Sequence, residues 1–375
     1  MPSQALQPMS DSFESSRPRL APAVSVVQDG ADTCYLMMTG KDLLRCHGPL
    51  VPTLMTRLLP LLDGTRSVAE IRQTLEGTLE AKRVEEVLRL LQRHHLLLDA
   101  GPEQELSMRE RAAFGSLLAL LARSTPQPYR VLERLRRMRL VVVGDSALAR
   151  EVVESLAECA LGAIDLVSPR EAWADLKLEL PVQLRHVDPG QLQDVVPGAE
   201  LVIGVQDGEF NFTRQMRELN RLCLRLGVSW LQVRLTLEAE GWLGPLHTPD
   251  TACFECMDLR MKSNLRTWRE HGLYEEQVEQ GLLMGPRIGF KPLQRQLAGA
   301  LAVEVLLHLT GLEASRLVGR SLVIDALSQE SSLHPVLKHP GCSACGKPPE
   351  ERLHPWSEED IRLDRTLLPD SAAAP

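Results

Sequence analysis

The stretch Leu140-Val-Val-Val-Gly-Asp-Ser-Ala-Leu-Ala149 indicates the fold class of the larger part of this 375-residue chain. Its continuous apolar run is typical of a strand that is buried on both faces of a parallel sheet. Gly144 ends the run, and Leu148, Val152 and Leu156 then recur at helical spacing. Similar strand-like runs follow at Ile164–Val167, Leu201–Val205, Trp230–Leu235 and Leu322–Ile324. This alternation predicts an α/β domain with a mostly parallel sheet that helices cover on both faces.

The turn after the first strand differs from a phosphate-binding turn. Such a turn reads G-x-G-x-x-G, and here only its first glycine, Gly144, is present. Asp145 would place negative charge where a phosphate should lie, and Ser168 stands where the second strand should supply an acidic residue for the ribose. We expect Asp145 or Ser146 to cap the helix instead. The sequence therefore predicts a degenerate nucleotide site and no ATP cofactor.

Two C-x-x-C pairs, Cys253-Phe-Glu-Cys256 and Cys342-Ser-Ala-Cys345, lie far apart in the chain. Two such pairs complete a tetrahedral sulfur shell, which suits zinc and leaves no open position for water. We therefore predict one structural zinc ion, held by Cys253, Cys256, Cys342 and Cys345. Four idle buried thiols or a redox dithiol are the alternatives. The other cysteines are expected to pack in the core or at strand edges.

The first part of the chain reads as a separate small module. Its pattern is strands, three helices and a final strand, which is winged-helix-like. Ser67 and Glu70 have capping-box spacing, and a later helix has a clean amphipathic pattern. The predicted division is a disordered tail at 1–20, the small module at 21–100, a helical connector at 101–138, the α/β domain at 139–350 and a second tail at 351–375.

Composition excludes several classes of protein. The formal net charge of -8 argues against a general nucleic-acid-binding surface. No signal-peptide core and no run of about 18 apolar residues appears, so neither export nor a membrane span is expected. The expected location is the cytoplasm, where thiols remain reduced.

Together these features resemble the ThiF/MoeB-type superfamily, whose members are similar to ubiquitin-activating enzymes. The stretch Gly244-Pro-Leu-His-Thr-Pro-Asp-Thr-Ala-Cys253 and the two C-x-x-C pairs most resemble one branch. That branch contains the cyclodehydratase partners of thiazole/oxazole-modified microcin (TOMM) biosynthesis, also called Ocin-ThiF-like or TOMM precursor leader peptide-binding proteins. Residues 21–100 resemble the PqqD-like recognition element of peptide-modifying systems.

The resemblance implies a non-catalytic subunit that binds a precursor's leader peptide and activates a YcaO cyclodehydratase, which forms azolines from Cys, Ser and Thr. Carried over by position, Gly144 and Asp207 remain from the adenylation machinery. A flavin-dependent azoline dehydrogenase and a second copy of the chain stay open as further partners. An adenylating enzyme and a winged-helix DNA-binding regulator are the competing functions.

Leader binding would add a peptide strand to an exposed sheet edge of the small module. We expect Thr33–Met38 and residues 41–46 to form the strand side of the binding groove, and the third helix of the small module to form its other wall. The predicted contacts are Tyr35, Leu36, Met37, Lys41, Leu43, Arg45, Arg83, Val87 and Leu90. Lys82, Arg83, Arg89 and Arg93 could attract an acidic leader. The alternative is that these side chains form an ordinary solvated helix face.

Overall fold

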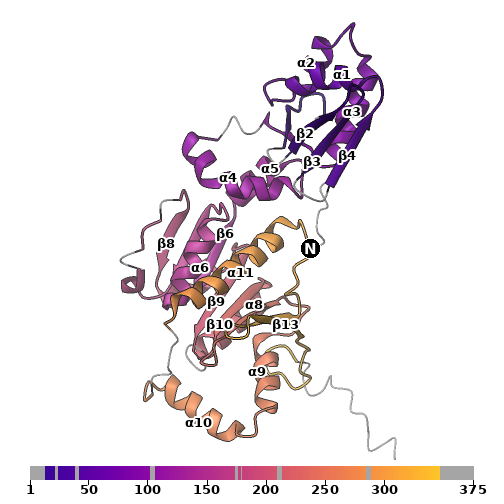
Figure 1. The fold of residues 1–375 in the computed structure, drawn as a ribbon. Helices are drawn as coiled ribbons and strands as arrows, with labels where there is room; N and C mark the ends of the chain where they lie inside the picture. Colours follow the sequence, from indigo (N-terminus) through magenta and orange to yellow (C-terminus); the bar gives the residue numbers. More distant parts are fainter. Residues whose placement is uncertain are drawn as a thin grey trace, which may run out of the picture.

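The computed structural model describes residues 13–21, 24–38, 42–101, 106–173, 176–178, 180–208, 213–283 and 289–346. A small N-terminal module is joined by a helical connector to a larger α/β domain (Figure 1). The second predicted tail, residues 351–375, and the predicted contact Lys41 lie outside the described residues.

The small module is built on a three-stranded antiparallel sheet in the order β2-β3-β4. The strands are β2 (Val24–Asp29), β3 (Thr33–Met38) and β4 (Asp42–His47). The helical segments are α1 (Val51–Thr53), the π-helix η1 (Leu54–Leu58), the 3-10 helix η2 (Leu59–Leu61), α2 (Val68–Thr74) and α3 (Ala81–Arg93). The capping box is present: the Glu70 amide donates to Ser67 Oγ at 3.2 Å, and the Ser67 amide donates to a Glu70 carboxylate oxygen at 2.7 Å. Sequence periodicity located these helices because the signal is local.

The prediction of a disordered tail over residues 1–20 is wrong for its last part. β1 (Pro18–Leu20) pairs antiparallel with β5 (Leu97–Asp99), and the Arg17 amide donates to the Asp99 carboxylate at 2.9 Å. Residues 1–12 lie outside the described residues. The closing strand β5 therefore pairs with the segment before residue 21, and not with the three-stranded sheet. The apolar content of this short segment is low, but its backbone groups are paired across the module.

The predicted helical connector consists of α4 (Met108–Ala122) and α5 (Pro128–Leu135), which are separated by residues 123–127. A second capping box, between Ser107 and Glu110, begins α4. Arg134 on α5 donates to the backbone oxygens of Leu309 and Thr310 at 2.8 Å each. These two oxygens belong to the last turn of α11 (Lys291–Thr310), so this arginine satisfies carbonyls that the helix cannot bond itself.

The larger domain is an eight-stranded sheet in the order β13-β12-β11-β10-β9-β6-β7-β8. The five strands from β8 to β10 run parallel, and β11, β12 and β13 extend the sheet antiparallel. Their bounds are β6 (Arg139–Val143), β7 (Ala163–Val167), β8 (Gln183–Val187), β9 (Leu201–Asp207), β10 (Trp230–Leu235), β11 (Glu240–His247), β12 (Arg320–Asp325) and β13 (Glu330–Pro335). The predicted mostly parallel α/β sheet is confirmed.

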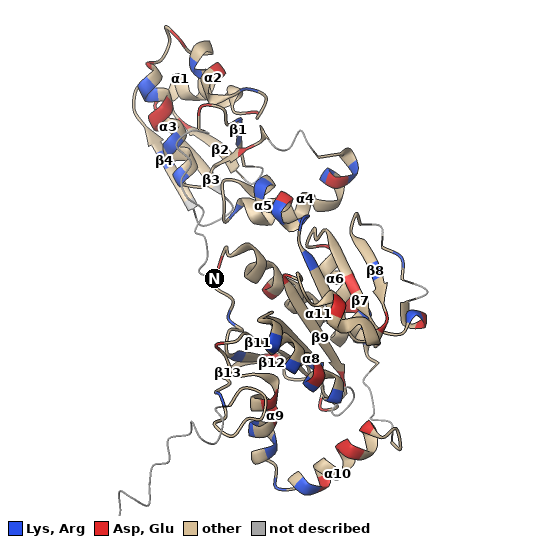
Figure 2. Cartoon of the chain, turned by 180° about the vertical axis from the view of Figure 1, so that it is seen from behind, with Lys and Arg blue, Asp and Glu red and all other residues tan. Residues whose placement is uncertain are grey.

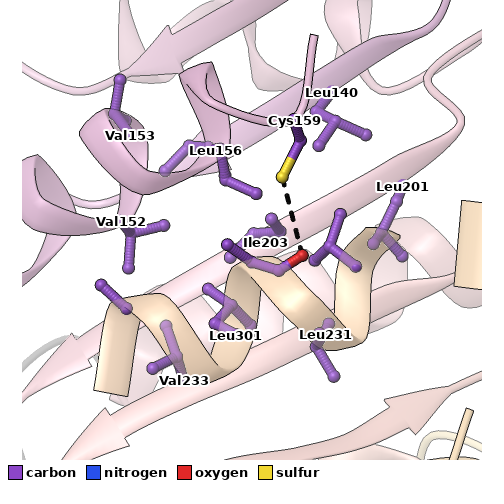
Figure 3. Close-up of a cluster of buried hydrophobic side chains, with 14 of the residues drawn as sticks. Leu140, Val152, Val153, Leu156, Cys159, Leu201, Ile203, Leu231, Val233 and Leu301 are labelled. Atoms are coloured by element: carbon purple, nitrogen blue, oxygen red, sulfur yellow. Dashed lines mark hydrogen bonds between the residues drawn. The ribbon is translucent and has the colours of Figure 1, made fainter. Parts of the chain in front are cut away.

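Helices cover both faces, because successive residues of each buried strand point to opposite sides. Leu140 and Val142 pack with α6 (Ala147–Ala157) and α11, whereas Val141 and Val143 pack with α8 (Thr213–Leu226) and α9 (Phe254–Ser263). Figure 3 shows the first of these clusters, in which the buried thiol of Cys159 lies 3.7 Å from the backbone oxygen of Ala302. Cys159 and Cys223 are core residues, as predicted.

Several elements gave no clear signal in the sequence. The buried residues of α11 recur at helical spacing, but apolar residues also occupy its exposed positions. The sequence therefore shows no clear amphipathic pattern for this helix. All six residues of β13 are exposed, and this strand is held by its pairing with β12 alone. Among the described residues, no helix is long and apolar enough to cross a membrane.

Candidate functional site

Four cysteines from two distant loops meet at the end of the larger domain. Cys253 is the N-cap residue of α9, Cys256 lies in its first turn, and Cys342 and Cys345 lie in the loop after β13. Their sulfur atoms all lie within 4.8 Å of one another, and the closest separations are 3.3, 3.5 and 3.8 Å. Four thiolates at about 2.3 Å from a tetrahedral zinc ion would be about 3.8 Å apart. The donor set therefore fits one metal ion of this kind.

Hydrogen bonds hold the second pair of cysteines against the first. Gly346 donates its amide to the Cys342 oxygen at 2.9 Å, and a Cβ at Gly346 would lie 2.4 Å from that oxygen, so only glycine fits there. Ser343 donates to Glu255 at 2.7 Å, and Arg221 of α8 donates to both oxygens of Glu255 at 2.7 and 3.3 Å. The sequence did not reveal this set of hydrogen bonds, because Arg221, Glu255 and Ser343 lie up to 122 positions apart in the chain and come together only in the folded domain.

The thiols differ in how easily they ionise. Burial opposes ionisation of Cys256, but hydrogen bonds from the His339 amide, at 3.2 Å, and from neighbouring thiols lower its pKa. Burial and the thiol of Cys256 raise the pKa of Cys345 to about 11. A bound cation would favour the thiolate form of all four ligands, so metal binding must release protons.

The residues of the predicted degenerate nucleotide site lie together. Gly144, Ser168 and Asp207 occupy the carboxyl ends of the adjacent parallel strands β6, β7 and β9. This edge is where α/β sheets bind ligands. Gly144 has φ of +150°, and a Cβ there would lie 3.0 Å from the Val205 side chain. The glycine is therefore needed for close packing as well as for the turn.

The turn is filled by the chain's own side chains. Ser146, and not Asp145, is the N-cap of α6: its hydroxyl accepts from the Ala149 amide at 3.2 Å. Ser146 and Ala149 stand at the positions of the second and third glycines. The Ser168 hydroxyl accepts from the indole nitrogen of Trp173. The Ala149 amide and the Ser168 hydroxyl are thus already hydrogen-bonded within the protein.

Asp165 is the acidic residue of β7, and its carboxylate pairs with arginines of the two neighbouring strands. It is fully buried and accepts from Arg139 at 2.6 Å and from Arg185 at 2.6 and 2.8 Å. The two arginines lie on β6 and β8, the strands on either side of β7, and their charges explain why a buried carboxylate is tolerated there.

A cavity of about 290 Å³ lies at the ends of β9 and β10, on the α8 and α9 side. Two buried amides form a chain beside it: Gln232 donates to Gln206 at 2.9 Å, and Gln206 donates to Thr213 at 3.3 Å. Further lining residues include Arg234, Met257, Lys262, His271 and Glu275. Five separate elements contribute to this cavity, including α10 (Trp268–Glu279), so no sequence motif revealed it.

The predicted leader-binding residues do not all lie on an available edge. β3 is the central strand and pairs with β2 and β4, so it cannot accept another strand, and Leu36 is fully buried. The expectation that Thr33–Met38 could form the docking edge is therefore wrong. The outer edge of β4 pairs with no other described strand, and Leu44 of β4 and Val87 of α3 pack against the same buried cluster.

Most of the remaining predicted contacts lie on β4 and α3. Leu43 is 56% exposed and Arg45 is exposed on β4, while Val87 and Leu90 are half-buried on α3. Arg83 pairs with Glu86 at 2.9 Å, and Arg89 pairs with Glu85 at 2.6 Å, so both acidic and basic residues lie on α3 (Figure 2). Two of the four basic residues expected to attract an acidic leader are thus paired within their own helix.

No protein-family model matches the sequence, and no curated protein matches it. Among solved structures, the heterocyclase TruD is similar over 88% of this chain and 43% of its own, with 20% identity and a TM-score of 0.61. A heterocyclase in complex with substrate and cofactor is similar over 88% of this chain and 39% of its own, with 19% identity and a TM-score of 0.58. This chain thus spans about two fifths of the length of these heterocyclases.

The microcin C7 biosynthetic enzyme MccB, in complex with N-formylated MccA, is similar over 88% of this chain and 99% of its own. The identity is 13% and the TM-score is 0.58. At such low identity, the agreement concerns the fold. The chain therefore shares its fold with the heterocyclase TruD and with the microcin C7 biosynthetic enzyme MccB.

Proposed function

We propose that this chain binds the leader of a ribosomally made precursor peptide and presents the peptide to a separate YcaO cyclodehydratase in the cytoplasm. The observation that carries the proposal is the outer edge of β4, which pairs with no other strand among the described residues. An extended peptide can add to such an edge through backbone hydrogen bonds, while side-chain pockets give register. The similarity in fold to the heterocyclase TruD, and to a heterocyclase in complex with substrate and cofactor, supports a role in heterocycle formation.

The four-cysteine centre has a structural role in this proposal, with zinc as its ion. Cys253, Cys256, Cys342 and Cys345 would hold it, and a complete sulfur shell leaves no position for a substrate. The centre joins the start of α9 to the loop after β13, near the carboxyl end of the described residues. Metal binding at this centre would stabilise the folded α/β domain, to which the small module is attached.

Leader binding is expected to require backbone contacts and no ATP. The probe is the fluorescently labelled leader of a precursor peptide encoded beside the gene, with fluorescence anisotropy as the measurement. N-methylation of successive leader residues should weaken binding at every second position, by about tenfold or more where a hydrogen bond is lost, because alternate amides of an added strand face β4. A leader that binds with no such alternation would contradict strand addition.

MccB is the reason to consider an adenylating enzyme, since its structures include one with ATP and nearly its whole length is matched. The turn at Gly144 argues against this function, because Ser146 and Ala149 replace glycines that allow close approach of a phosphate. We expect the pure protein to show no ATP–pyrophosphate exchange above a blank, with or without precursor peptide. Exchange by the protein alone would support adenylation instead.

A further inference from the structure

The chemistry of the leader can be deduced from the side chains that border the free edge of β4. This inference rests on the proposed function. We propose that Arg45, on the outer face of β4, selects the charge of the leader: the added strand carries an acidic residue beside Arg45 and an apolar residue two positions away, beside Leu43.

The register of the small sheet places these two side chains on one face. Side chains alternate between the faces of a strand, and directly paired residues share a face. Leu36 and Cys34 of β3 are fully buried, so they mark the inner face. The outer face carries the rows Val27–Tyr35–Arg45 and Ser25–Met37–Leu43.

A strand that pairs with β4 extends each of these rows by one side chain. One new outer side chain would lie beside Arg45, and the next would lie beside Leu43. Leu43 and its neighbour Met37 are 56% and 39% exposed, so an apolar side chain there would remove apolar surface from water. The intervening leader residue would point inward, toward the half-buried Leu44 and Val87.

The ion pairs within the small module favour Arg45 over Arg83 and Arg89 of α3 as the residue that selects the charge of the leader. Arg45 forms no ion pair with any residue in the described part of the chain, whereas Arg83 and Arg89 are paired with glutamates of their own helix. An acidic leader residue beside Arg45 gains a new partner. Beside Arg83 it would compete with Glu86 and be repelled by it.

The full-length protein can be tested with a displayed library of random nonapeptides, which requires no knowledge of the natural leader. Peptides enriched on the unmodified protein should carry Asp or Glu two positions from an apolar residue. On Arg45→Glu the enriched residue at the same position should become Lys or Arg. Arg83→Glu is the matched control on α3 and should retain the acidic preference.

The binding affinity of one selected peptide then gives the size of this charge effect. Replacing its acidic residue with lysine should weaken binding to the unmodified protein about threefold or more, and Arg45→Glu should restore that loss, because opposite charges across a strand pair attract and like charges repel. Since Arg45 is exposed, metal content and melting temperature should be unchanged in the variant, which excludes misfolding.

The possible outcomes separate this inference from the proposed function. Enriched peptides without a charge reversal on Arg45→Glu would overturn the assignment of Arg45 and leave peptide binding in place. A reversal on Arg83→Glu instead would assign charge selection to α3 and also overturn it. The absence of any enriched peptide would overturn both proposals.

Discussion

Cys256→Ser is expected to release the metal and to lower the melting temperature of the protein by about 10 °C or more, because the binding free energy of a structural zinc ion contributes directly to folding. Cys256 is fully buried, and its sulfur lies 3.3 Å from the sulfur of Cys345, 89 residues later in the chain. A serine hydroxyl is a poor replacement in a thiolate shell. The connection between α9 and the loop after β13 would then be lost.

Elemental analysis should give one zinc per chain in the unmodified protein, and X-ray absorption should show four sulfur ligands. Cys46→Ser is the matched control, because that cysteine is half-buried in the small module and far from the metal site in the chain. It should retain zinc and most of the stability. Fewer than three sulfur atoms around the ion would rule out the four-cysteine site. Zinc should also be lost as the pH falls, since protons compete for the thiolates.

Asp165→Ala is expected to lower the free energy of unfolding by about 2–4 kcal/mol, because removal of one partner leaves charges at the sheet without compensation. The carboxylate is fully buried and accepts hydrogen bonds from both Arg139 and Arg185. The expected loss is smaller than for a wholly buried pair, since the Arg185 side chain is 47% exposed and can reach water.

Urea denaturation can measure this loss. Asp188→Ala is the matched control, because Asp188 is an exposed acidic residue in the segment just after β8, and its side chain caps no helix. The control should change stability by less than about 0.5 kcal/mol. If Asp165→Ala instead left stability unchanged and altered nucleotide binding, then Asp165 would belong to a functional nucleotide site and the degenerate assignment would be wrong.

Local signals explain which parts of the structure could be predicted from the sequence. The two C-x-x-C pairs identified four cysteines that do meet, because residues three apart in a turn can share one ion. The capping box at Ser67 and the apolar run before Gly144 likewise depend on neighbours within a few positions. The departures from the glycine-rich pattern at Ser146 and Ala149 were also evident from sequence alone.

Pairing between distant segments was decided only by the tertiary structure. The sequence could identify β3 and β4 as strands, but it could not tell that β3 is central and that β4 has the free edge, because strand order depends on which backbone groups meet. The same holds for β1 and β5, about 80 positions apart, and for the two arginines that flank Asp165. A pattern of side chains reports how each segment can fold, whereas the partners of its edges and charges depend on long-range packing that no local pattern contains.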